Sequence, residues 1–252
     1  MHPPLPALFE VLCLSPHTTV VISLCISHPY RLLLSRSYGG FAKLSGYGDL
    51  WNGISSNILE FNVHNFTFLN FRANTGTSSI STSLYGAIIY DAYSYSRTKM
   101  YDCTFNRTRA TYGGLYYSSS SPGNWELNGC TGSNLRSTSY GGIGYAYYAS
   151  ARFIDTKLSD VFSTYYSIVY GFYMTLYTEN TEFVGFVDAA SSAAYVVYGG
   201  AVIDSSTFRD CDVSNAVIMH YPYTYFTSNG IQIRDSVFTG TAPLSANRPI
   251  PI

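Results

Sequence analysis

The segment Met100-Tyr-Asp-Cys-Thr-Phe105 decides the fold of this 252-residue chain, because altered copies of it recur along the sequence. The copies are Leu127-Asn-Gly-Cys-Thr131, Phe153-Ile-Asp-Thr-Lys-Leu158, Tyr177-Thr-Glu-Asn-Thr-Glu-Phe183, Val202-Ile-Asp-Ser-Ser-Thr-Phe208 and Ile233-Arg-Asp-Ser-Val-Phe238. The closing residues Phe105, Thr131, Leu158, Phe183, Phe208 and Phe238 are separated by 26, 27, 25, 25 and 30 positions. A period of this length, sustained over six copies, predicts a repeat architecture.

Each copy has the pattern of a short strand, with alternating residues of β-branched and aromatic type. A second apolar strand follows in each unit, as in Ala87-Ile-Ile-Tyr90 and Tyr195-Val-Val-Tyr198, and Gly, Ser, Asn and Thr clusters separate the strands. One such unit does not bury its own apolar face, so successive units must stack. The sequence therefore predicts an all-β parallel β-helix of about seven coils, each of about 25–28 residues.

A polar residue recurs three positions before each closing residue. The set is Asp102, Asn128, Asp155, Asn180, Ser205 and Asp235. A recurring polar residue is typical of a turn, and acids alternate with neutral residues along most of the ladder. Because like charges on neighbouring strands repel, this alternation favours a stacked arrangement.

Four short segments resemble a known group. Tyr112-Gly-Gly-Leu-Tyr116, Tyr140-Gly-Gly-Ile143 and Tyr198-Gly-Gly-Ala-Val202 resemble the Gly-Gly-Ala-Ile motif of the polymorphic membrane protein repeats, and Phe71-Arg-Ala-Asn74 is similar to their Phe-x-x-Asn motif. Cys103 and Cys211 stand in segments similar to the surface repeats of parasitic protists. The resemblance implies a right-handed parallel β-helix of the pectin-lyase-like type, displayed at a cell surface or secreted, and often adhesive.

The sequence departs from that pattern in one respect. Phe-x-x-Asn occurs once, and later units carry other residues in the Asn place, namely Thr108, Val161, Phe186, Cys211 and Thr241.

Composition narrows the partners that we expect. The formal charge is −1 and only 12% of residues are charged, so the chain lacks the basic footprint of a nucleic-acid-binding protein. Tyrosine is abundant, with 25 residues. No apolar stretch is long enough for a transmembrane span. A glycan or a host or cell-surface protein is the expected partner.

The chain has five cysteines, and their spacing follows the repeat rather than a metal motif. We expect them to be small buried side chains inside the coil, with a bridge between Cys103 and Cys130 on neighbouring rungs as the alternative. The triplets beginning at Asn65 and Asn106 are glycosylation sequons.

Three parts are expected along the chain. Residues 1–38 do not follow the repeat and read as an irregular segment: a cap, a degenerate first rung, a signal or a disordered start. Residues 39–242 form the β-helix, and a Pro-containing tail occupies 243–252. No closing cap is apparent after Phe238, so we expect either a fragment of a longer chain or a partner docked on the last rung.

An enzyme is the alternative to a binding protein. Polysaccharide lyases and glycoside hydrolases of the pectin-lyase-like superfamily use clustered carboxylates, and a lyase would also hold Ca²⁺. The strongest cluster is Asp204, Asp210 and Asp212, with Arg209 or Arg234 nearby. The five histidines have no metal-ligand spacing, so no metal or other cofactor is expected unless the enzyme alternative holds.

The aromatic residues indicate binding more strongly than the acids indicate catalysis. Tyr221, Tyr223 and Tyr225 alternate, so they would share one face of an extended segment, and Pro222 favours a loop or edge. Exposed Tyr suits sugars and protein partners, whereas stacked Tyr would only stabilise the coil. The sequence thus favours a non-enzymatic adhesion or ligand-binding module over a polysaccharide-cleaving enzyme, with a virion or fibre stalk third.

Overall fold

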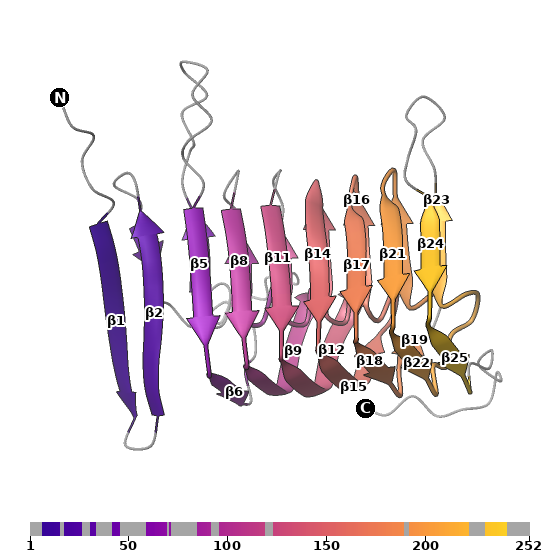
Figure 1. Cartoon of the computed structure of the whole chain (residues 1–252), viewed down its shortest axis with the longest axis horizontal. Coiled ribbons are helices and arrows are strands. Elements are labelled where there is room, and N and C mark those ends of the chain that lie inside the picture. The colour runs from indigo at the N-terminus through magenta and orange to yellow at the C-terminus, as the bar shows by residue number, and fades with distance from the viewer. Residues whose placement is uncertain are drawn as a thin grey trace, which may run out of the picture.

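A computed structural model describes residues 7–15, 18–26, 31–33, 42–45, 59–69, 71, 85–91, 96–118, 123–188, 192–221 and 230–240. All described elements are strands, and they form three sheets (Figure 1). Sheet A has the order β1 (Ala7–Ser15), β2 (Thr18–Ile26), β5 (Leu59–His64), β8 (Ser96–Tyr101), β11 (Gly123–Asn128), β14 (Ala149–Ile154), β17 (Thr175–Glu179), β21 (Gly200–Asp204) and β24 (Ile231–Arg234). Sheet B has β3 (Arg31–Leu33), β4 (Ala42–Ser45), β7 (Ile89–Asp91), β10 (Tyr116–Ser118), β13 (Gly144–Tyr147), β16 (Val169–Phe172), β20 (Ala194–Val197) and β23 (Ile218–Tyr221). Sheet C has β6 (Thr67–Leu69), β9 (Thr104–Tyr112), β12 (Thr131–Tyr140), β15 (Lys157–Ser163), β18 (Glu182–Val184), β22 (Thr207–Arg209) and β25 (Val237–Thr239), and β19 (Val187–Asp188) also pairs with β15.

The chain passes from sheet A to sheet C to sheet B in each coil, and equivalent strands pair in parallel with the next coil. The solenoid makes about five turns of roughly 26 residues. The predicted all-β parallel β-helix is therefore confirmed, with fewer complete turns than the seven coils that we expected. No helix among the described residues is long and apolar enough to cross a bilayer.

The first strands depart from the parallel pattern. β1 pairs antiparallel with β2, and β2 pairs antiparallel with β5, so the two strands extend sheet A at its N-terminal end. β3 pairs antiparallel with β4 in sheet B. Residues 243–252, the expected tail, lie outside the described residues.

The core is a column of apolar side chains enclosed by the three sheets. The inward position of sheet C carries Phe68, Phe105, Leu158, Phe183 and Phe208, all fully buried. Neighbouring phenylalanine rings stack along the axis, with ring centroids 5.3 Å apart for Phe68 and Phe105 and 4.8 Å apart for Phe183 and Phe208. Residues one repeat apart thus become direct neighbours, which explains why the sequence repeats its aromatic closing residue.

The register corrects one copy of the repeat. Gly132, not Thr131, pairs with Phe105, and Gly129, not Asn128, occupies the turn between sheets A and C. The turn residues are left-handed in every rung, with positive φ at Asn65, Asp102, Gly129, Asp155, Asn180, Ser205 and Asp235. Asn, Asp and Gly adopt this conformation most readily, which is why the position is polar or Gly.

The predicted alternation of acidic and neutral residues along this ladder has a direct consequence. Asn180 donates a hydrogen bond from Nδ2 to Asp155 Oδ1 on the preceding rung, at 3.2 Å. An acid at position 180 would instead oppose the Asp155 carboxylate.

A second ladder of buried residues runs beside the first and includes Cys103 and Cys130. Cys130, Thr156, Thr181 and Ser206 follow the turn residues and are buried. Thr156 Oγ1 accepts from the Cys130 backbone amide and donates to Leu127 O, and Thr181 Oγ1 donates to Phe153 O. Cys130 Sγ contacts Met100 O in the same way, at 3.3 Å. Cys103, Cys130 and Cys211 are buried free thiols, as expected, and no Cys103–Cys130 disulfide is formed.

The Tyr-Gly-Gly motifs occupy two different corners. Tyr112-Gly-Gly and Tyr140-Gly-Gly lead from sheet C into β10 and β13 of sheet B, whereas Tyr198-Gly-Gly leads from β20 into β21 of sheet A. The third match is therefore not structurally equivalent to the other two.

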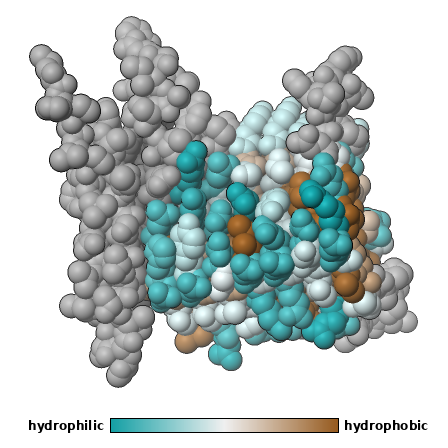
Figure 2. Space-filling model, in the orientation of Figure 1, coloured by the Kyte–Doolittle hydropathy of each residue, from teal (hydrophilic) through white to brown (hydrophobic). Residues whose placement is uncertain are grey.

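The last rung leaves inward-facing positions uncovered. Ile231 and Ile233 pair with Ala201 and Ile203, which are fully buried, yet they are 40% and 51% exposed. Figure 2 shows hydrophobic residues at this end of an otherwise largely hydrophilic face. Among the described residues, the last rung thus exposes apolar side chains whose counterparts in the preceding rung are buried.

Candidate functional site

The outer face of sheet B and its flanking corners carry most of the described tyrosines, in three rows parallel to the solenoid axis. One row has one residue per rung of sheet B, the second lies at the corner leading into that sheet, and the third lies at the corner leaving it. The rows are Tyr117, Tyr145, Tyr170 and Tyr195; Tyr85, Tyr112, Tyr140 and Tyr165; and Tyr148, Tyr173, Tyr198 and Tyr221. We call this surface the tyrosine face.

Most rings in these rows stack on one another. Ring centroids are 5.0 Å apart for Tyr117 and Tyr145, 5.9 Å for Tyr112 and Tyr140, and 4.5 Å for Tyr148 and Tyr173, with interplanar angles of 16°, 6° and 3°. Because the ring faces contact each other, the rows turn mainly ring edges to the outside. The tyrosines therefore form the ladders expected to stabilise the coil, and these ladders cover the outer side of sheet B with aromatic residues.

Four tyrosines of the face have a raised pKa. Burial raises the pKa of Tyr140, Tyr145, Tyr170 and Tyr195 above the usual tyrosine value, and neighbouring tyrosines add to the effect. These four hydroxyl groups therefore remain protonated at neutral pH and add no charge to the face.

Three tyrosines of the third row have an unusual backbone conformation. Tyr148, Tyr173 and Tyr198 have φ values of 49°, 49° and 57°, in the left-handed region that bulky residues rarely adopt. Tyr148 and Tyr173 are also among the most exposed aromatic residues, at 46% and 40%. Strained residues of this kind concentrate at functional sites.

The tyrosines predicted as ligand-binding are only partly described. Tyr221 ends β23, is 55% exposed, and contacts Tyr198 with ring centroids 6.1 Å apart. Tyr223 and Tyr225 lie outside the described residues. The sequence therefore pointed to one end of a larger surface, whose members become neighbours only through the coil.

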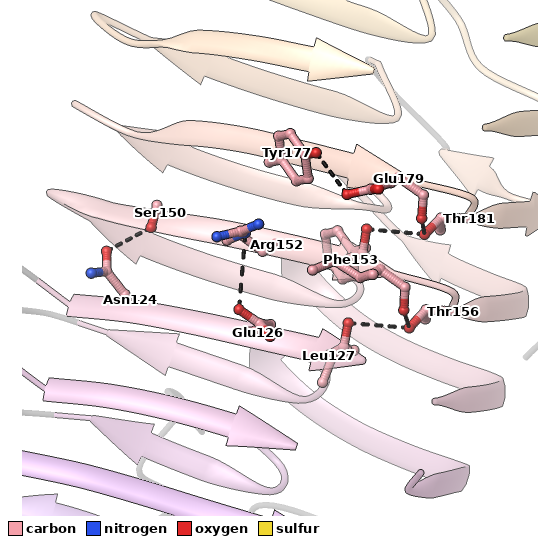
Figure 3. Close-up of polar contacts among 11 residues, drawn as sticks. Asn124, Glu126, Leu127, Ser150, Arg152, Phe153, Thr156, Tyr177, Glu179 and Thr181 are labelled. Atoms are coloured by element: carbon pink, nitrogen blue, oxygen red, sulfur yellow. Dashed lines mark hydrogen bonds and ion pairs between the residues drawn. The ribbon is translucent and has the colours of Figure 1, made fainter. Parts of the chain in front are cut away.

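Tyr177 belongs to a different surface. It lies on the outer side of sheet A, where its hydroxyl donates to Glu179 Oε2 at 2.7 Å and its ring carries the Arg152 guanidinium at 4.8 Å (Figure 3). Arg97, Lys99 and Arg152 also lie on this side of sheet A, around a depression of about 280 Å³. Sequence analysis missed this group, because the three cations meet only through the register of β8, β11 and β14.

The residues of the enzyme alternative come from two sheets. Asp204 ends β21 in sheet A, whereas Asp210 and Asp212 follow β22 in sheet C. Arg209 is engaged elsewhere, with Nη2 2.9 Å from Glu182 Oε1. Arg234 pairs with Asp204 in the register of β21 and β24. The structure therefore does not gather the three acids on one strand face.

The described residues contain no group of three or more His, Cys, Asp or Glu side chains placed to hold a metal ion. Of the two sequons, Asn65 is exposed in a turn, whereas Asn106 is half-buried and its Thr108 is buried. Asn65 is thus the more accessible of the two predicted glycosylation positions.

Comparison of the chain with family models, with curated proteins and with solved structures finds no match to any of them.

Proposed function

We propose that this chain is a non-enzymatic binding solenoid, displayed at a cell surface or secreted, whose tyrosine face engages a protein partner. The observation that carries the proposal is the continuity of that face. Between the first two rows, ring centroids are 5.6 Å apart for Tyr112 and Tyr145 and 5.1 Å apart for Tyr140 and Tyr170. Phe172 joins the third row to them, with its ring centroid 5.3 Å from that of Tyr170 and 6.5 Å from that of Tyr198. Tyrosine is the residue type most suited to protein interfaces, because it provides a large contact area and loses little conformational entropy.

The way the rings are arranged favours a protein over a sugar. A sugar stacks on the open face of an aromatic ring, but within these rows the faces are already occupied by neighbouring rings. Stacked ring edges beside the exposed tyrosines Tyr148, Tyr173 and Tyr221 instead suit a broad interface with mixed apolar and hydrogen-bonding contacts. The resemblance of Tyr112–Tyr116 and Tyr140–Ile143 to polymorphic membrane protein repeats supports surface display and adhesion.

The test is a binding screen of the full chain against immobilised cell-surface and extracellular-matrix proteins, with neutral and acidic polysaccharides in parallel. We expect retention on at least one protein, weakened about tenfold or more in Tyr148→Ser/Tyr173→Ser, which corresponds to about 1.4 kcal/mol. The matched control is Tyr101→Ser/Tyr177→Ser, which removes two tyrosines from sheet A and should bind as wild type does.

Three results would contradict the proposal. Equal loss in both double variants would mean that the tyrosine face is not the binding surface. Retention on polysaccharides alone would replace the protein partner with a glycan. Cleavage products that depend on Ca²⁺ and vanish in Asp210→Asn would favour the enzyme alternative.

A further inference from the structure

We propose a second binding site on the outer side of sheet A, suited to an acidic oligosaccharide that carries carboxylate or sulfate groups. The site is the depression of about 280 Å³ that spans β8, β11 and β14, and we call it the basic groove. It lies on a different sheet from the tyrosine face, so it stands independently of the proposed function.

Charge is the first argument for an anionic ligand. The groove is lined by Arg97, Lys99, Arg152 and Glu126, which gives a net charge of +2 on a chain whose overall formal charge is −1. Glu126 pairs with Lys99 on the preceding rung and with Arg152 on the next rung, so its carboxylate separates the two cations. Arg152 stays 47% exposed although Nε lies 3.9 Å from Glu126 Oε2, and the Glu126 side chain is only 15% exposed. About half of the Arg152 side chain is therefore exposed, while the Glu126 side chain is largely covered.

The second argument is the fixed position of Arg152. Its guanidinium lies 4.8 Å from the centre of the Tyr177 ring, on the neighbouring rung. The Tyr177 hydroxyl is held by Glu179, 2.7 Å away, and Figure 3 shows this chain of contacts along the face of the sheet. A guanidinium held on a ring loses little freedom on binding, and its planar donors match carboxylate or sulfate oxygens.

The third argument separates a sugar from a simple anion. Beside the charges, Ser150 Oγ donates to Asn124 Oδ1 at 2.6 Å, and both residues line the groove. This bond leaves the Asn124 amide donors and a Ser150 acceptor available, and such a pair recognises hydroxyl groups. The cations of β8 and β14 are two rungs apart, which is about 9.5 Å. A ligand that carries separated anionic groups with hydroxyls between them fits this layout.

The experiment measures retention of the full chain on heparin, on desulfated heparin and on polygalacturonate, each at rising salt. A single-stranded oligonucleotide serves as a polyanion whose charges are phosphates and which is not a polysaccharide. We expect binding to at least one of the three glycans, stronger than to the oligonucleotide. Binding to heparin alone identifies sulfate as the anionic group, and binding to desulfated heparin or polygalacturonate identifies carboxylate.

Two charge-matched variants test the location of the site. Arg97→Gln/Arg152→Gln should weaken glycan binding about tenfold or more, since each lost charged hydrogen bond is worth a factor of about ten. Arg107→Gln/Arg109→Gln removes the same charge from exposed positions of sheet C and should bind as wild type does. Circular dichroism and thermal unfolding would show whether each variant is folded, and Lys99→Gln gives a second, milder test. Equal loss in both double variants, equal binding of the oligonucleotide, or no glycan binding by the wild-type chain would each overturn the proposal.

Discussion

Thr156 Oγ1 lies 3.2 Å from Leu127 O on the preceding rung and 2.8 Å from Ile154 O in its own rung, and its single hydrogen is shared between these two acceptors. Figure 3 shows Thr156 and Thr181 in equivalent positions at the corner between sheets A and C. The hydroxyl thus connects two coils at a buried turn, where a backbone carbonyl without a partner is costly.

This relationship predicts how the corner responds to substitution. Thr156→Val keeps the shape of the side chain but removes the hydroxyl, so it should lower the free energy of unfolding by about 1–3 kcal/mol. Thr156→Ser should cost less, because Ser206 already serves at the equivalent position. Thr104→Val, at an exposed position, is the control and should change little. Equal midpoints in chemical denaturation for the Val and Ser variants would contradict this explanation.

Cys211, which follows β22 in sheet C, should be unreactive in the folded chain. Burial raises the pKa of the Cys211 thiol to about 11, so at pH 8 almost none of it is the reactive thiolate. Cys211 is fully buried, which also limits access. In Cys13→Ser/Cys25→Ser/Cys103→Ser/Cys130→Ser protein, where Cys211 is the remaining thiol, labelling by a disulfide reagent at pH 8 should be slow and should become fast in denaturant. Rapid labelling of the folded protein would mean that the segment after β22 opens.

The ion pairs that Glu182 forms with Lys157 and Arg209 on sheet C should make a small, pH-dependent contribution to stability. Glu182 Oε2 lies 2.6 Å from Lys157 Nζ, and Lys157 first and Arg209 second hold the pKa of Glu182 below its usual value. A carboxyl whose pKa is lowered by folding stabilises the fold above its unfolded pKa of about 4.3, and this stabilisation disappears as the pH falls through the folded pKa.

Glu182→Gln should therefore lower the free energy of unfolding at pH 7 by no more than about 1 kcal/mol, because the group is partly exposed and screened by solvent. At pH 3 or below, the difference between variant and wild type should shrink. Thermal unfolding at both pH values, combined with a Lys157→Gln double-mutant cycle, measures the effect. A difference that grows as the pH falls would have the wrong sign.

Removing a phenylalanine ring from the core column should lower the free energy of unfolding by an amount that depends on its rung. Phe208 is fully buried between Phe183 and Phe238, both with ring centroids 4.8 Å away, so Phe208→Ala should cost about 3–5 kcal/mol. Phe238 lies on the last rung and is only partly buried, so Phe238→Ala should cost clearly less. Urea denaturation of the two variants compares them directly, and equal costs would show that the last rung is covered as well as the interior.

The sequence predicted the repeat but not the full register. The period was visible because stacked rungs require similar side chains at equivalent positions, as in the buried column from Phe68 to Phe208. The copy ending near Thr131 was misplaced by one residue because Gly129 and Gly132 replace the polar and aromatic residues that mark other rungs. A Cβ on Gly132 would lie 2.6 Å from Leu158 Cδ2, so packing on the next rung, which is invisible in a local pattern, determines that glycine.

The candidate sites were less predictable because they are assembled across rungs. Tyr145 and Tyr170 are 25 positions apart, yet their ring centroids are 5.1 Å apart. In the same way, Lys99 and Arg152 meet only through Glu126 on the strand between them. A motif search reads neighbours in sequence, whereas this surface depends on neighbours in the next coil. Tyr221 was predicted because it lies in a local alternation, whereas the other members of the tyrosine face become one surface only in the coil.

The left-handed tyrosines provide the sharpest separation of binding from stability. A side chain in this conformation costs about 1–2 kcal/mol, a cost that glycine does not incur. Tyr173→Gly removes the stack on Tyr148 but relieves the backbone, so the free energy of unfolding should change by less than about 1 kcal/mol. Tyr170→Ala, from the half-buried row with an ordinary backbone, should destabilise the chain by more.

If Tyr173 contacts the partner, Tyr173→Gly should weaken binding to the protein found in the screen. The thermal midpoint of the variant should stay close to that of the wild type. Calorimetry and a binding titration on the same preparation measure both quantities. A large loss of stability with unchanged binding would show that Tyr173 serves the coil rather than the partner, because strain at a position without a binding role must be offset by packing alone.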